Sequence, residues 1–137
     1  MTASVLILAA GAASAQVMVH DLKVQVLMAN GVNPAALAFW AGGNDPPEGE
    51  TPAEADARWA AALKGAQDLR AHGRALTGLS RPGRWNDDAR LMIDTAGEGL
   101  AAARARDAEK AFELGGRLYD SCNGCHKAYI PTPPRAP

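Results

Sequence analysis

The stretch DAEKAFELGGRLYDSCNGCHKAY, residues 107–129, decides the fold class and contains the candidate site. Asp107 is a favourable helix N-cap, and prolines from Pro131 onward end the helix because proline lacks a backbone donor. Between them, apolar residues recur at three- and four-residue steps, which is the period of an amphipathic helix. The stripe predicted to face the core consists of Ala108, Ala111, Phe112, Gly115, Leu118, Tyr119, Cys122, Cys125 and Tyr129.

Three further helical segments precede this one. The first covers about residues 17–40 and contains Pro34, which is expected to kink or split it. The second begins at a capping box formed by Thr51 and Glu54, and the third covers about residues 86–106. Because the connections are short and no strand pattern is found, we expect an all-α, up-down-up-down antiparallel four-helix bundle, in which the fourth helix ends beside the start of the first.

The length and charge of the chain limit its class. With 137 residues it suits one domain, and 14 basic against 15 acidic residues give a formal charge of -1. This balance excludes the basic surface of a nucleic-acid-binding protein.

The beginning of the chain has the features of an export signal. An apolar run over residues 5–10 is followed by Ala13-Ser14-Ala15, which has the small-x-small form of a signal-peptidase site. We predict that residues 1–15 are a signal peptide, that residues 16–137 form the mature domain, and that the protein is periplasmic. The run is too short to span a bilayer, so no stable membrane insertion is expected.

Both cysteines of the chain belong to the motif Cys122-Asn123-Gly124-Cys125-His126, whose C-x-x-C-H pattern is typical of covalent haem attachment. Two thiols three residues apart on a helix can add to the two vinyl groups of one haem, which thereby becomes haem c. His126, four residues after Cys122, then projects from the same side towards the iron. Three other interpretations use the same residues: a redox-active dithiol, an i,i+3 disulfide, and a zinc site completed by His20 or His72.

A four-helix chain with C-x-x-C-H close to its C-terminus resembles the class II cytochromes c, which include cytochrome c′ and its low-spin His/Met relatives. Tyr129, three residues after His126, adds to the resemblance. The resemblance implies that the first helix supplies the distal side of the iron, where Met28 is the candidate ligand. It also implies association as a homodimer, which in that family often uses the first two helices.

The predicted function is periplasmic one-electron transfer through a His126/Met28-ligated haem, without enzymatic activity, between membrane oxidoreductases and soluble redox partner proteins. The alternative is a five-coordinate haem protein that binds or senses NO or CO. Other side chains are given simpler roles: Met92 packs in the core, and His72 lies on the surface. Close approach of another helix or of the haem edge is expected at Gly115 and Gly116, and the candidate cations for haem propionates are Lys23, Arg81 and Arg84.

Overall fold

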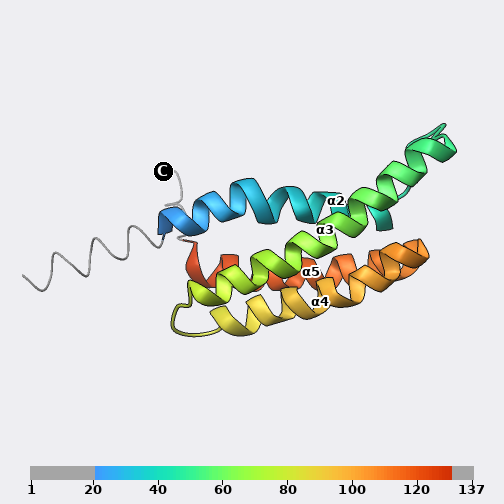
Figure 1. Ribbon diagram of the computed structural model, residues 1–137. Helices are drawn as coiled ribbons and strands as arrows, with labels where there is room; N and C mark the ends of the chain where they lie inside the picture. The colour runs from blue at the N-terminus through green and yellow to red at the C-terminus, as the bar shows by residue number, and fades with distance from the viewer. Residues whose placement is uncertain (1–20, 131–137) are drawn as a thin grey trace, which may run out of the picture.

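The computed structural model describes residues 21–130, which form helices joined by short turns and contain no strand (Figure 1). The first helix covers residues 21–43 and consists of residues 21–27, the π-helical turn η1 (Met28–Val32) and α2 (Asn33–Gly43). It is followed by α3 (Pro52–Gly78), α4 (Trp85–Ala105) and α5 (Ala108–Tyr129). The predicted all-α class is therefore confirmed for this part of the chain, whereas the predicted signal peptide lies outside it.

The four helices run alternately up and down and pack side by side along their lengths. Residue 21, the turn between α3 and α4, and the end of α5 all lie at one end of the bundle (Figure 1). The fourth helix thus ends near the beginning of the first, as the topology predicts. No helix among the described residues is both long and apolar enough to cross a membrane.

Two predicted helix starts are confirmed by their hydrogen bonds. The Thr51 hydroxyl accepts from the Glu54 backbone N–H at 3.3 Å, and the Glu54 carboxylate accepts from the Thr51 backbone N–H at 2.8 Å. The Asp107 carboxylate accepts from the Lys110 backbone N–H at 2.9 Å. Each cap satisfies backbone donors that have no partner within the helix.

Pro34 does not split the first helix. Proline removes its own N–H donor and its ring presses on the carbonyl four residues back, and the chain accommodates both effects with one wider turn. The Asn33 N–H donates to the Met28 carbonyl, five residues earlier, so that η1 contains one residue more than an α-helical turn. The helix continues on both sides of this turn, and its N-terminal part is rotated by about one residue position.

The core is built largely from alanine and a few large side chains. Phe39 is fully buried, and a Cβ atom on Gly99 would lie 2.7 Å from its ring, so α4 approaches the first helix closely. Met92 is buried, as predicted, and the core also contains Trp59 and Trp85. The predicted stripe on α5 is wrong at its edge, since Phe112 and Tyr119 are 67% and 58% exposed.

Candidate functional site

The C-x-x-C-H motif occupies the last turns of α5. Cys122 and Cys125 are half-buried free thiols that pack against the main hydrophobic core, whereas His126 is exposed. At 100° per residue, His126 lies about 40° around the helix from Cys122, so the two side chains leave α5 in similar directions. The two sulfur atoms are thus sheltered while the imidazole is accessible.

An ion pair on α4 packs directly against the motif. Asp88 is only 3% exposed, and Arg84 donates to its two carboxylate oxygens at 2.7 and 2.8 Å. A Cβ atom on Gly124 would lie 2.5 Å from Asp88 Oδ1 and 2.6 Å from Arg84 Nη2. Glycine is therefore favoured between the cysteines, because a side chain there would overlap this pair unless the pair shifts.

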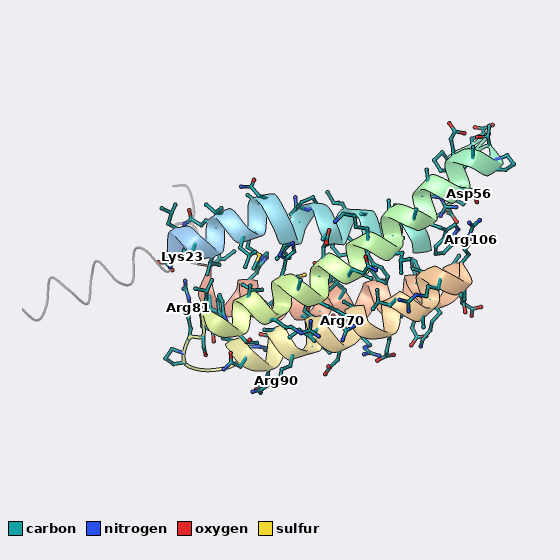
Figure 2. All side chains as sticks on the ribbon, in the orientation of Figure 1. Lys23, Asp56, Arg70, Arg81, Arg90 and Arg106 are labelled. Carbon is teal, nitrogen blue, oxygen red and sulfur yellow. The ribbon has the colours of Figure 1, made fainter. Side chains whose placement is uncertain are left out.

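Tyr129 holds the end of α5 against the start of α4. Its hydroxyl donates to the Pro82 carbonyl at 2.6 Å and accepts from the Trp85 backbone N–H at 3.0 Å. Its ring meets the Trp85 ring edge-on at 5.1 Å. Arg81, whose guanidinium lies over Trp85, pairs with Asp21 and so connects the first helix to the same cluster (Figure 2).

The environment of the thiols raises the pKa of both. Burial is the largest cause for each cysteine, and it raises the pKa of Cys125 to about 11 with help from the neighbouring Asp88 carboxylate. Redox-active dithiols show the opposite behaviour, because their pKa values are lowered so that thiolate is present near neutral pH. The surroundings of Cys122 and Cys125 therefore do not favour a redox dithiol.

The first helix and α5 pack closely at the end of the bundle away from the motif. A Cβ atom on Gly43 would lie 2.5 Å from the Phe112 backbone nitrogen. One turn further along, the Trp40 indole N–H donates to the Gly115 carbonyl at 3.0 Å, and Trp40 occupies the space that a Gly115 side chain would need. These contacts establish which sides of the two antiparallel helices face each other.

Helical periodicity extends this facing relation to Met28 and His126. His126 follows Gly115 by 11 residues, which is about three turns and about 16 Å along α5 in nearly the same direction. Met28 precedes Trp40 by 12 residues, but the extra residue in η1 makes the two positions equivalent to 11 apart in a regular helix. Met28 and His126 therefore occupy matching levels and matching sides of the two helices.

Met28 is also chemically accessible at this level. Its side chain is half-buried and packs against the same core as Cys122, Cys125 and Tyr129. Without the π-helical turn, Met28 would be rotated by about 100°, towards the middle of the core. Helical periodicity therefore assigns Met28 to the side of the first helix that faces α5.

The residues present fit a covalently attached haem better than a zinc ion. Structural zinc needs four ligands, yet no group of three or more His, Cys, Asp or Glu side chains within residues 21–130 could hold a metal ion. His20, one of the proposed additional ligands, lies outside the described residues. Haem c needs only the two thiols, one imidazole and, in a six-coordinate form, one thioether.

Comparisons with protein-family models, with curated proteins and with solved structures find no match for this chain.

The predicted propionate cations have different environments. Arg81 already pairs with Asp21, and Arg84 pairs with Asp88, while Lys23 is exposed on the first helix. Figure 2 shows Lys23 and Arg81 at the end of the bundle where α5 finishes. All three remain candidates for contact with an anionic group beside the motif.

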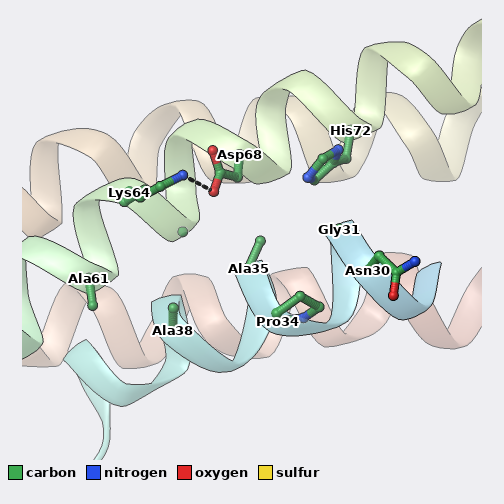
Figure 3. Close-up of a pocket in the computed structure, with 10 residues that line it drawn as sticks. Asn30, Gly31, Pro34, Ala35, Ala38, Ala61, Lys64, Asp68 and His72 are labelled. Atoms are coloured by element: carbon green, nitrogen blue, oxygen red, sulfur yellow. Dashed lines mark hydrogen bonds and ion pairs between the residues drawn. The ribbon is translucent and has the colours of Figure 1, made fainter. Parts of the chain in front are cut away.

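The prediction for His72 is wrong. Its ring is half-buried between α3 and the first helix, and a Cβ atom on Gly31 would lie 2.8 Å from it. It lines a hollow of about 310 Å³ with the ion-paired Lys64 and Asp68 (Figure 3). The missing side chain at Gly31 lets the ring fit between the helices.

Asp88 is the main residue of this site that the sequence analysis did not identify. In the sequence, an acidic residue near a helix start predicts only a favourable interaction with the helix dipole. Its spacing of four residues from Arg84 was a signal for the ion pair. Nothing in the local sequence indicated that the pair would pack on Gly124, some forty positions away.

Proposed function

We propose that the protein is a periplasmic monohaem cytochrome that transfers single electrons, with haem c attached through Cys122 and Cys125. In this proposal His126 and Met28 are the axial ligands of the iron, and the haem supplies a one-electron couple when bound. Support for the proposal comes best from helical periodicity, which assigns Met28 and His126 to corresponding levels of the first helix and α5 once the Trp40–Gly115 contact and the π-helical turn are taken into account. This arrangement suits six-coordinate iron.

The surrounding residues would serve electron transfer by holding the ligands still. The Arg84–Asp88 pair packs on Gly124, and Tyr129 ties the end of α5 to Pro82 and Trp85. A rigid ligand set minimises the rearrangement that accompanies each change of charge on the iron. No acid, base or nucleophile of a catalytic reaction is invoked, and the partners would be membrane oxidoreductases and soluble redox proteins.

The proposal is tested with optical and magnetic spectra of the purified holoprotein. We expect low-spin iron in both oxidation states, with the weak far-red absorption of a thioether-ligated ferric haem. Met28→Leu keeps the volume but removes the thioether sulfur, so it should give a high-spin ferric signal and rapid CO binding after reduction. Met92→Leu is the matched control, because Met92 is a buried core methionine on α4, and its spectra should be unchanged.

Two results would contradict parts of the proposal. A wild-type protein that is high-spin and binds CO readily would instead be the five-coordinate NO- or CO-binding protein. Unaltered low-spin spectra of Met28→Leu would assign the distal ligand to another residue. The attachment itself is tested by replacing both Cys122 and Cys125 with serine, which should abolish haem retention in denaturing electrophoresis.

A further inference from the structure

One side of the bundle exposes an unusual amount of apolar surface. Six large apolar side chains of the described residues are 52–67% exposed, and all lie on the first helix or on α5 and the residue after it. They are Leu22, Val26, Leu37, Phe112, Tyr119 and Ile130. We call this surface the apolar face. No comparable side chain is exposed on α3 or α4 among the described residues.

The first helix also lacks charge. From residue 24 to residue 44 the sequence contains no Asp, Glu, Lys or Arg, although eight of these 21 residues are exposed. The outer surfaces of α3, α4 and α5 contain charges of both signs, as solvated helices usually do. Depletion of charge is typical of the buried centre of a protein interface.

A groove runs between α2 and α5 within the apolar face. It has a volume of about 510 Å³, and Leu37, Phe112 and Tyr119 line it together with Gly115 and Gly116. Gly115 is explained by its contact with Trp40, but a Cβ atom on Gly116 would meet nothing within 4 Å. Glycine is unfavourable inside a helix, so Gly116 has no evident role within one molecule, whereas close approach of a second molecule would require it.

We infer that the apolar face is the interface of a symmetric homodimer. Taking roughly 200 Å² for each large side chain, the exposed fractions correspond to roughly 700 Å² of apolar surface. Stable interfaces bury about 800 Å² on each partner, so one second copy matches the available area. Leu37 and Phe112 lie at the edges of the groove. In a two-fold symmetric dimer these side chains of each copy can enter the groove of the other copy.

The absence of charge favours a second copy over a transient redox partner. Short-lived electron-transfer encounters are small and are steered by complementary charges, whereas permanent homodimer interfaces are more apolar. The outer side of α3 includes Lys64 and Asp68 on a charged surface. A dimer through the first two helices, as implied by the family resemblance, would place those charges at its interface, and the apolar face would remain exposed.

The inference is tested by measuring the mass of the purified full holoprotein in solution by sedimentation equilibrium over micromolar concentrations. We expect a dimer, and Leu37→Glu or Phe112→Glu should weaken association at least tenfold. Gly116→Lys should also give monomers while retaining or increasing thermal stability, because lysine favours helix more than glycine does. That variant separates loss of the dimer from loss of the fold.

Ala101→Glu is the matched control, since it adds the same charge at an exposed position on α4. It should remain dimeric. A monomeric wild type at the highest concentration, or a dimer insensitive to all three face variants, would overturn the inference. So would a monomer that binds phosphatidylethanolamine–phosphatidylglycerol vesicles through the same residues, which would make the face a lipid-binding surface. The measured mass does not depend on which residue ligates the iron, so this test and the spectroscopic test can fail separately.

Discussion

Gly124→Ala tests the packing on which the attachment site rests. The new methyl group would lie 2.5 Å from Asp88 Oδ1, 2.6 Å from Arg84 Nη2 and 2.9 Å from Asp88 Cγ. Arg84 is more than half exposed and can move aside, but Asp88 is 3% exposed and is enclosed by the bundle. The Asp88 carboxylate or the start of α4 must therefore shift.

The expected effect is a balance of two opposing contributions. Inserting a methyl group into a closely packed site costs about 1–3 kcal/mol. Replacing glycine by alanine inside a helix returns about 1 kcal/mol at most. Because Asp88 is enclosed, we expect the cost of inserting the methyl group to lie in the upper part of that range. The free energy of unfolding then decreases by about 1–2 kcal/mol, which lowers the melting temperature of a domain of this size by roughly 4–8 °C.

The measurement is thermal and urea unfolding of the full protein followed by circular dichroism. Gly97→Ala is the control, because its Cβ atom would make only an ordinary contact at 3.7 Å with Arg70 Nε. We expect Gly97→Ala to gain about 0.5–1 kcal/mol. Combining Gly124→Ala with Asp88→Ala should cost less than the sum of the single changes, because the methyl group then has room.

Equal stabilisation by Gly124→Ala and Gly97→Ala would refute this reasoning. It would mean that α4 does not press on the C-x-x-C-H turn and that Gly124 has no packing role. An additive double variant would also contradict it, because it would show that the Gly124 methyl and the Asp88 carboxylate do not compete for the same space.

Three further predictions concern the ends of the helices. Thr51→Ala removes the hydroxyl that accepts from Glu54 N–H and should cost about 1 kcal/mol in chemical unfolding; no loss would mean that the cap is not formed in solution. Tyr129→Phe leaves the Pro82 carbonyl and the Trp85 N–H without their partner and should cost about 1–2 kcal/mol; an unchanged free energy of unfolding would mean that these two hydrogen bonds are not formed in solution. The Arg58 guanidinium donates to Glu50 at 2.6 and 2.9 Å and lowers the Glu50 pKa below 4.5. This pairing therefore stabilises the fold above pH 4.5 and is lost as the pH falls through the lowered pKa. Glu50→Gln should thus have a lower free energy of unfolding than wild type at pH 7, and this difference should disappear at acidic pH. A difference that does not depend on pH would contradict the proposed ion pair. Glu48→Gln is the control.

The helix boundaries could be predicted because they depend on neighbouring residues. The capping box at Thr51 and the cap at Asp107 act within a few positions, and both appear where expected, whereas the first helix continues to Gly43, three residues beyond its expected end. The same reasoning misplaced Phe112, Tyr119 and His72. Helical period shows that residues share a side, but how much of that side is covered depends on the distance to the next helix.

The residues 107–129 by themselves determined a helix with Cys122, Cys125 and His126 at the spacing that haem attachment needs, since spacing along one helix is a local property. Only the tertiary structure decided what lies against that helix. It placed Asp88 on Gly124, and it introduced the π-helical turn before Pro34, which shifts the helical register of Met28 by one residue. Both results depend on contacts between segments far apart in the chain, which local sequence rules do not encode.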